Sequence, residues 1–231
     1  MLAEGREPKH EIIAGPGETV KEMSEKTTRN DVRPLILGST SRYRRALLER
    51  LGVPFAVAAP AIDESTLSGE TPAATAMRLS EAKARAVASR YADALVIGSD
   101  QVADCDGHAI GKPGGRVEAV AQLRRLSGRT IVFHTGLALV DARSGRCRAE
   151  MVDVASTFRA LTDAEIDAYL DREEPYDCAG SVRSEALGIA LFERIASDDP
   201  TALIGLPLIA LTRLLRAEGV NVLLRPASIG S

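Results

Sequence analysis

The chain has 231 residues, a formal net charge of -3 and 45% hydrophobic residues, which suits one α/β domain or two lobes that share a cleft. This mildly acidic balance argues against a general nucleic-acid binder, so any cluster of arginines is a local feature. Cys105, Cys147 and Cys178 are widely spaced and form no C-x-x-C motif, which argues against a disulfide framework or a structural zinc site and fits a reducing compartment.

No stretch of the sequence approaches the roughly 18 apolar residues that a membrane helix needs, and the first ten residues lack the apolar core of a signal peptide. We therefore expect a cytoplasmic protein that binds no membrane. Residues 1–33 carry many charges of both signs and little apolar periodicity, and we interpret them as a disordered or loosely attached extension. A regulatory or partner-binding arm is the alternative.

Residues 35–45 (LILGSTSRYRR) form a short apolar run that passes into glycine and hydroxyl residues and then into three arginines. We predict a buried strand end at residues 35–37 and a helix that has Ser41 as its N-cap and ends at Gly52. A helix N-terminus has unpaired N–H groups and a partial positive charge, so together with the neighbouring side chains it would suit a polyphosphate. The sequence here is not a P-loop, and an ordinary turn with solvated arginines is the alternative. The side chains of this predicted anion cradle are Ser39, Ser41, Arg42, Arg44 and Arg45.

The second predicted strand, residues 54–59, is followed by an acidic pair, Asp63 and Glu64. Ligand groups in α/β proteins often follow strand ends, so one of these carboxylates could hold a divalent cation; both could equally be solvated. A long helix is predicted from Thr71 to about Arg90. It contains Lys83, which is either a second phosphate contact or a surface lysine.

Residues 94–98 (ALVIG) form a nearly continuous apolar run, typical of a central strand that is buried on both faces. Asp100 and Gln101 follow at the predicted strand end, where a buried carboxylate is costly unless it is used or paired. The Asp106-Gly107 turn signal then leads to residues 110–113. Lys112 could therefore meet Asp100 across one cleft, or lie on the surface.

The second half of the chain predicts helices at 117–126 and 162–170, the latter opened by a Thr162–Glu165 capping box, and antiparallel strands at 130–140 and 151–158. A strand is predicted at 188–192, and Glu185 just before it could accept hydrogen bonds from a base. We interpret His134, inside a strand, as structural, since three isolated histidines form no Ser-His-Asp triad. A final apolar helix follows a tight turn within residues 202–215, and the tail at 226–231 is expected to be loose.

Taken in order, these segments resemble the Maf-like nucleotide pyrophosphatases from about Leu35 to Asn221. No single segment is decisive, but the ordered set is highly specific. The resemblance implies an elongated α/β fold, similar to that of the inosine triphosphatases, in which a mixed curved sheet separates two lobes around a central cleft. It implies a domain at 34–225 and, as in many members, a homodimer. The segments that carry it are residues 35–45, 62–64 (IDE), 83–84 (KA), 98–102 (GSDQV), 111–113 (GKP), 126–128 (LSG), 135–136 (TG) and 204–207 (IGLP).

The resemblance also implies an activity: hydrolysis of a nucleoside triphosphate between the α and β phosphates, with a divalent metal cation, Mg²⁺ or Mn²⁺. Asp100 matches the catalytic carboxylate of the family, which is thought to activate water, and Glu64 matches an acidic position associated with the metal. A polyanionic substrate requires cations that stabilise the charge on the leaving pyrophosphate. The positions that match the phosphate-side groups are Ser39, Arg44, Arg45, Lys83 and Lys112.

Tyr43, Gln101 and Glu185 differ from the pattern of the dTTP and UTP branch of the family and resemble the branch that hydrolyses 7-methyl-GTP. The 7-methylguanine base is cationic, so Tyr43 could stack on it while Glu185 accepts hydrogen bonds from N1 and N2. The chain departs from that branch at Tyr43, where tryptophan is frequent, and at Arg42, where proline is usual. These departures put base affinity and selectivity in question.

Two other readings of the sequence remain. One is a Maf-like pyrophosphatase that acts on dTTP or UTP, which Tyr43, Gln101 and Glu185 disfavour. The other is a nucleotide-binding regulator of division that no longer hydrolyses its ligand. The presence of Asp100, Lys83 and Lys112 argues against this second reading.

Overall fold

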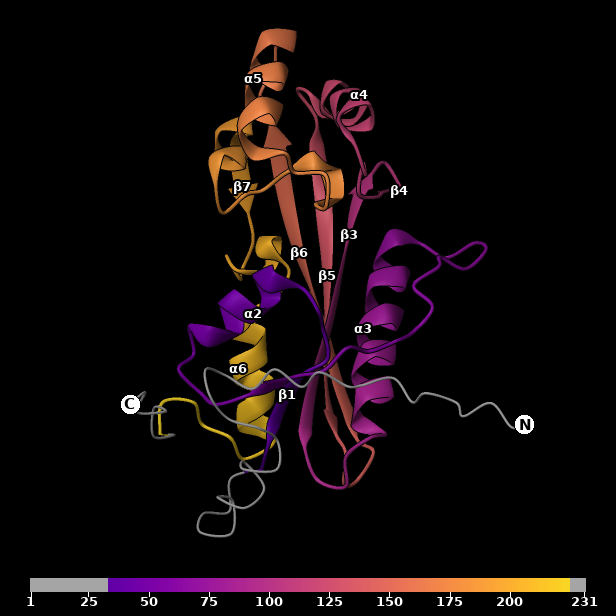
Figure 1. The fold of residues 1–231 in the computed structure, drawn as a ribbon, viewed down its shortest axis with the longest axis vertical. Coiled ribbons are helices and arrows are strands. Elements are labelled where there is room, and N and C mark those ends of the chain that lie inside the picture. Colours follow the sequence, from indigo (N-terminus) through magenta and orange to yellow (C-terminus); the bar gives the residue numbers. More distant parts are fainter. Residues whose placement is uncertain (1–32, 225–231) are drawn as a thin grey trace, which may run out of the picture.

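The computed structural model describes residues 33–224. The predictions made for the N-terminal extension and for the C-terminal tail therefore fall outside the described residues, apart from Arg33. Within them, two groups of helices lie at opposite ends of one long, twisted sheet (Figure 1). This elongated α/β architecture with two lobes confirms the fold class predicted from the sequence.

The sheet has seven strands in the order β2-β1-β3-β5-β6-β7, with β4 paired to β3 outside this path. Strand β1 pairs in parallel with β2 and with β3, and the other pairings are antiparallel. The sheet is therefore mixed, as expected. The strands are β1 (Leu35–Leu37), β2 (Ala56–Val57), β3 (Leu95–Cys105), β4 (His108–Ile110), β5 (Thr130–Asp141), β6 (Cys147–Phe158) and β7 (Phe192–Ala196).

The helices divide between the two lobes. In the lower lobe of Figure 1, α3 (Pro72–Ala88) covers one face of the sheet, while α2 (Arg42–Glu49) and α6 (Leu208–Ala217) lie on the other. In the upper lobe, α4 (Arg116–Leu126) and α5 (Asp163–Glu173) pack at the far end of the long strands. The buried apolar side chains accordingly form one cluster in the upper lobe and two in the lower lobe, on either side of the sheet.

The space between the lobes lies beside the middle of strand β3. Its residues 95–97 pair with β1, and its residues 103–105 pair with β4. Between them, residues 98–102 hydrogen-bond to β5 on one side and have no strand neighbour on the other side within the described residues. The prediction that Asp100 follows a strand end was wrong, because the register with β5 continues unbroken from Leu95 to Asp104. Asp100 instead lies in mid-strand, opposite the gap.

Helix α3 approaches the sheet closely at two glycines. A Cβ atom at Gly98 would lie 2.6 Å from the backbone nitrogen of Ala84, and one at Gly136 would lie 2.6 Å from the carbonyl oxygen of Ala76. Neither distance leaves room for a side chain. The two glycines therefore set the separation between α3 and the strands β3 and β5.

Several local predictions are confirmed. The Asp106-Gly107 turn between β3 and β4 has positive φ at both residues (56° and 81°), as a tight hairpin requires. Ser41 caps α2 by accepting a hydrogen bond from the Arg44 N–H. The Thr162–Glu165 capping box at the start of α5 has both of its hydrogen bonds.

The strand predicted at residues 188–192 was wrong. Residues Leu187–Leu191 form a 3-10 helix, and strand β7 begins only at Phe192. A Cβ at Gly188 would lie 2.8 Å from the Arg183 carbonyl carbon, so the chain folds back on itself here. A short apolar run is compatible with either conformation, and Leu191 and Phe192 are buried in the structure.

Candidate active site

A cavity of about 820 Å³ opens at the gap beside β3. A smaller chamber of about 130 Å³ adjoins it, and Tyr43, Gln101 and Lys112 line both spaces. All the site residues predicted from the sequence except Arg45 and Asp63 line one of the two. The large cavity is lined by Ser39, Tyr43, Arg44, Glu64, Lys83, Asp100, Gln101 and Lys112, among others. The small chamber adds Glu185 and Cys178.

The buried ammonium group of Lys83 joins two carboxylates. Its Nζ lies 2.6 Å from Oδ1 of Asp100 and 2.7 Å from Oε2 of Glu64, and the Lys83 side chain is only 5% exposed. The Asp100 N–H donates to Oγ of Ser80, one turn before Lys83 on α3. Helix α3 thus contacts both the backbone N–H and the carboxylate of Asp100. Lys83 is therefore buried, and the alternative of a surface lysine, which the sequence left open, was wrong.

Arg44 reaches the same carboxylate from the opposite wall. Its Nε donates to the carbonyl oxygen of Gly205 at 2.9 Å, and its NH2 lies 3.8 Å from Oδ1 of Asp100. Burial lowers the pKa of Arg44, while the negative charges of Asp100 and Glu64 act to raise it. Guanidinium remains charged under these conditions. Two cations from two different helices therefore converge on Asp100, at the N-terminus of α2.

The amide of Gln101 has a fixed orientation. Its Nε2 donates to Oγ1 of Thr135 (2.9 Å) and to the carbonyl oxygens of Ala202 (2.9 Å) and Leu203 (3.0 Å). Because the NH₂ group faces these three acceptors, the amide oxygen points the other way. Gln101 therefore offers an acceptor to a ligand in the cleft, where it lines both spaces.

Tyr43 stands at the boundary between the two spaces. Its hydroxyl donates to Oδ2 of Asp177 at 3.5 Å and lies 3.8 Å from Sγ of Cys178, so α2 touches the upper lobe here. Burial raises the pKa of the Cys178 thiol to about 11, which keeps it protonated and unreactive at neutral pH. The Arg42 guanidinium carbon lies 4.7 Å from the centroid of the Tyr43 ring. Tyr43 lines the small chamber together with Cys178 and the exposed Glu185.

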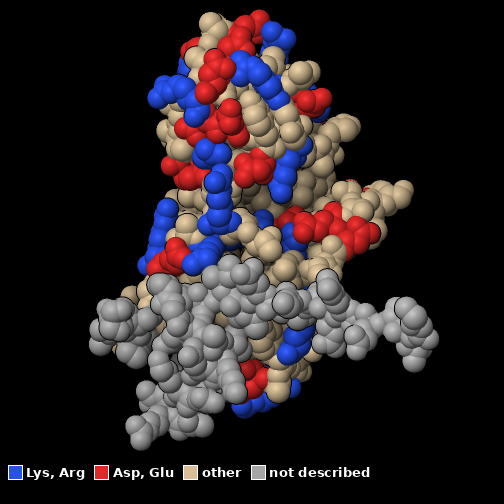
Figure 2. Space-filling model, in the orientation of Figure 1, with Lys and Arg blue, Asp and Glu red and all other residues tan. Residues whose placement is uncertain are grey.

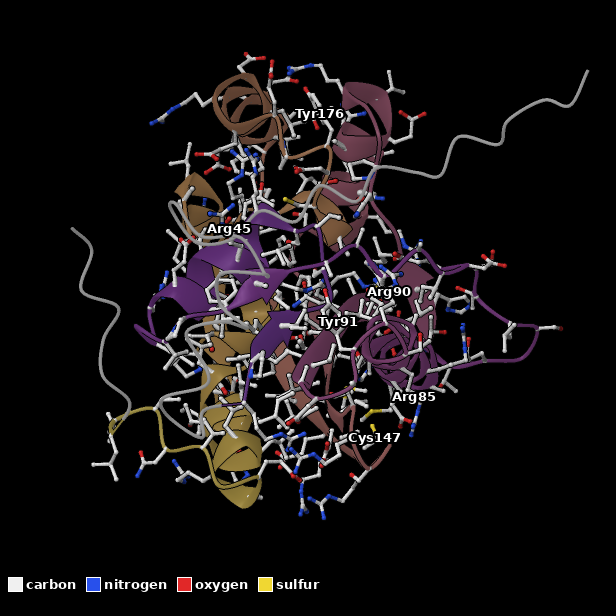
Figure 3. The ribbon with its side chains drawn as sticks, turned by 60° about the horizontal axis from the view of Figure 1, so that its bottom comes forward. Arg45, Arg85, Arg90, Tyr91, Cys147 and Tyr176 are labelled. Carbon is white, nitrogen blue, oxygen red and sulfur yellow. The ribbon has the colours of Figure 1, made fainter. Side chains whose placement is uncertain are left out.

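Arg45 and Asp63 are the predicted site residues that the structure does not bring to the cleft. Asp63 is exposed, and its Oδ1 accepts from the Ser65 N–H at 2.9 Å. The Nε of Arg45 pairs with Oε1 of Glu49 at 2.9 Å, one turn further along α2, where Figure 3 labels Arg45. The histidine expected to be structural, His134, lies outside the cleft, with Nδ1 2.7 Å from Oδ1 of Asp153.

The segment that carries Glu64 is held at both ends by arginines that the sequence did not indicate. Arg90, labelled in Figure 3, donates to the carbonyl oxygen of Ala59 at 2.9 Å. Arg78 donates to the carbonyl oxygen of Ser65 at 2.9 Å and to the Glu70 carboxylate at 2.6 Å. The hydrogen bonds from Arg78 are the main cause that lowers the pKa of Glu70 to about 2.

The donor set of the cavity fits a hard cation shared with phosphates. Within the described residues, no group of three or more His, Cys, Asp or Glu side chains could hold a metal alone. Mg²⁺ is usually held by one or two carboxylates together with substrate phosphates. Glu64 faces the cavity beside Asp100, and hydrogen bonds engage only one oxygen of each carboxylate within the described residues. A shared cation is therefore compatible with these side chains, whereas a closed zinc site is not.

Two further observations concern possible partners. No helix among residues 33–224 is long and apolar enough to cross a membrane. Basic and acidic side chains are interspersed over the described part of the face shown in Figure 2.

The chain is similar to known proteins over most of its length. A family model described as Maf-like protein matches residues 34–218. The chain is 60% identical over 191 residues to a 7-methyl-GTP pyrophosphatase of Cupriavidus metallidurans, covering 82% of this chain and 96% of the relative. It is 58% identical over 194 residues to a protein of the same name from Thiobacillus denitrificans (84% and 96% covered). A third such relative, from Burkholderia pseudomallei, is 60% identical over 196 residues (84% and 91% covered).

Proposed function

The chain belongs to the Maf-like protein family, and from this membership and the cleft we propose that it hydrolyses 7-methyl-GTP to 7-methyl-GMP and pyrophosphate. The observation that carries the proposal is the buried Lys83, which bridges Asp100 and Glu64 opposite Arg44. Such an arrangement of cations and carboxylates suits a polyphosphate and an attacking water. The choice of 7-methyl-GTP as the nucleotide rests on the names of the relatives given above, which are 58–60% identical to the chain.

In the proposed reaction, Asp100 accepts a proton from a water molecule that adds to the α-phosphorus. The bond between this phosphorus and the oxygen that bridges to the β-phosphate breaks, and pyrophosphate leaves with the negative charge. Lys83 and Arg44 hold the Asp100 carboxylate in place, and with the N–H groups of α2 they stabilise the charge that moves onto the phosphates. Glu64 would hold a bound Mg²⁺ or Mn²⁺ with the substrate phosphates, and the cation supplies further charge neutralisation.

The base side of the proposal rests on acceptors and one aromatic ring. The 7-methylguanine base is a cation with N–H donors, and the small chamber offers the Glu185 carboxylate and the amide oxygen of Gln101. Tyr43, at the mouth of this chamber, would attract the cationic base by a cation–π interaction. GTP has the same donors but a neutral base, so Tyr43 favours the methylated nucleotide.

The remaining parts of the proposal follow from the family. They are a domain at residues 34–225, a Mg²⁺ or Mn²⁺ requirement, a cytoplasmic location and a homodimer. Arg45, which pairs with Glu49 outside the cleft, would act on substrate only after that ion pair opens. Lys112 is exposed and lines both spaces, so it remains a proposed phosphate contact.

The test is pyrophosphate release from 7-methyl-GTP, GTP, dTTP, UTP and CTP, with Mg²⁺ or Mn²⁺, by wild type and by Asp100→Asn. Asp104→Asn is the matched control, because Asp104 lies on the same strand but lines neither space. We expect 7-methyl-GTP to be the best substrate, Asp100→Asn to bind nucleotide without turnover, and the control to stay active. Faster hydrolysis of dTTP or UTP would place the chain in the other branch. If wild type binds but cleaves nothing, it is a nucleotide-binding regulator.

A further inference from the structure

Asp199 is almost fully buried, 2% exposed, and lines neither space of the cleft. Its Oδ2 accepts from the N–H groups of Ile209 (2.7 Å) and Ala210 (3.1 Å), in the first turn of α6. Its Oδ1 accepts from the hydroxyl of Thr201 (2.7 Å) and from the Thr201 N–H (3.2 Å). One carboxylate thus ties the start of the turn at residues 201–207 to the helix that follows it.

Thr201 closes the same turn from inside. Its Oγ1 donates to Asp199 and accepts from the N–H of Leu208 at 2.8 Å. Because Asp199 and Thr201 together satisfy the first N–H groups of α6, the six residues between Thr201 and Leu208 form a rigid loop with fixed ends.

Three carbonyl oxygens of this loop accept hydrogen bonds from residues of the site. Those of Ala202 and Leu203 accept both hydrogen bonds that orient the Gln101 amide from this side. That of Gly205 accepts from Nε of Arg44 and from Oγ of Ser99, each at 2.9 Å. The loop therefore places one group on the base side of the cleft and one on the phosphate side.

We propose that Asp199 is a positioning residue that sets both nucleotide affinity and base selectivity through the carbonyl oxygens of residues 202, 203 and 205. It touches no substrate and acts only through Gln101 and Arg44. Without the carboxylate, the Ile209 and Ala210 N–H groups lose a buried acceptor, and the loop carries its carbonyls out of register with the two side chains. The inference rests on the proposed function for the choice of nucleotide.

The control for this proposal is the other end of α6. Glu218, with its side chain 4% exposed, accepts from Arg146 and Arg148 and so anchors the C-terminus of α6 to the β5–β6 hairpin. Glu218→Ala removes a buried carboxylate from the same helix, far from the carbonyl oxygens. It therefore reports what loss of α6 anchoring does by itself.

The experiment measures kcat and KM for 7-methyl-GTP and GTP, calorimetric binding of 7-methyl-GTP, and Tm. The variants are Asp199→Ala, Asp199→Asn, Thr201→Val and Glu218→Ala. We expect Asp199→Ala to lower kcat/KM for 7-methyl-GTP by about 10- to 100-fold, as a small misplacement of positioning groups does, and to lower the preference over GTP. Asp199→Asn, whose amide oxygen can still accept from α6, should retain part of kcat/KM for 7-methyl-GTP and part of the preference over GTP. Thr201→Val should show the same loss in milder form.

Glu218→Ala should lower Tm but leave KM and the preference unchanged. The proposal is overturned if Asp199→Ala and Thr201→Val keep kcat/KM for 7-methyl-GTP and the preference over GTP within about twofold of wild type. It is also overturned if Glu218→Ala lowers the preference as much as Asp199→Ala does. Should Asp199→Ala fail to fold, Asp199→Asn and Thr201→Val decide between the same results. If wild type cleaves no nucleotide, the proposed function fails, and calorimetric binding still shows whether Asp199 positions the site.

Discussion

Lys83 and Asp100 lie 17 residues apart in the chain and meet with 2.6 Å between Nζ and Oδ1, almost out of contact with water. One comes from a helix and the other from the middle of a strand, so the pair forms only when α3 packs on the sheet. Glu64 contacts the same ammonium group at 2.7 Å, and NH2 of Arg44 lies 3.8 Å from the same Asp100 oxygen. Two carboxylates therefore face two cations at this point, so each carboxylate is paired before a ligand enters the cleft.

Replacing Lys83 by Met should abolish most activity and also destabilise the protein, because Asp100 is left buried without its closest counter-charge. We expect kcat to fall by about 10²- to 10³-fold, as with the loss of one charge-stabilising donor. Urea unfolding of Lys83→Met, Asp100→Asn and the double variant measures the coupling between the two side chains. If the double variant is no more stable than the sum of the single changes predicts, the two residues are not coupled.

Arg78 should influence metal activation through Glu64. Arg78→Ala releases the Ser65 carbonyl and the Glu70 carboxylate, so we expect a higher Mn²⁺ concentration at half-maximal activity and faster proteolysis within residues 59–70. In a Glu64→Gln background the Arg78 change should have no further effect on Mn²⁺ dependence. Arg85→Ala, on the exposed side of the same helix, is the control. An undiminished effect in the double variant would show that Arg78 acts by another route.

The Glu70–Arg78 pair should make stability depend on acid pH. The pKa of Glu70 falls from an ordinary 4.5 to about 2 in the folded protein, so its ionised form is favoured by folding. The contribution is present above pH 4.5 and is lost as pH falls toward 2. Urea midpoints of wild type and Glu70→Gln should therefore differ at pH 6 to 7 and converge as the pH approaches 2. A difference that stays constant over this range would contradict the assignment.

Tyr43 should contribute to selectivity through its ring and not through its hydroxyl. Tyr43→Ala should lower the preference for 7-methyl-GTP over GTP by roughly 2- to 30-fold, the range that a cation–π interaction of about 0.5–2 kcal/mol gives. Tyr43→Phe, which loses the hydroxyl contacts with Arg42 and Asp177 but keeps the ring, should retain the preference. Steady-state rates with the two nucleotides measure both. Equal losses in the two variants would assign the effect to the hydroxyl.

Gly98→Ala should be strongly destabilising and should also lower activity. The added methyl group would lie 2.6 Å from the backbone nitrogen of Ala84, so α3 must move outward and carry Lys83 with it. Overpacking of this kind costs about 1–3 kcal/mol. Gly111→Ala, where the methyl group meets no atom within 4 Å, should unfold at the same urea concentration as wild type.

Local signals predicted much of this fold and site, because they depend on neighbours in the sequence. Ser41, the Asp106-Gly107 turn and the Thr162 capping box all act within four residues. The difference between Arg44 and Arg45 was also within reach: Arg44 lies three and four residues before the buried Leu47 and Leu48, whereas Arg45 lies four residues before Glu49.

The other features depend on residues that are distant in sequence. The mid-strand position of Asp100 arises because β1 ends early and β4 begins late along β3, which no local pattern reports. Arg78 and Asp199 act through carbonyl oxygens, and a carbonyl is present at every residue. A sequence motif therefore cannot distinguish the ones that are used.

Gly98 and Gly136 affect the cleft only by letting α3 pack close to the sheet, and this limits which substitutions the protein tolerates there. Every larger residue at either position would widen the helix-to-sheet spacing, and a long, flexible lysine cannot make up the difference without leaving its rotamer. We therefore expect natural variants at these two positions to be as rare as variants at Asp100 itself. A search for important residues that considered only the lining of the cleft would miss both glycines.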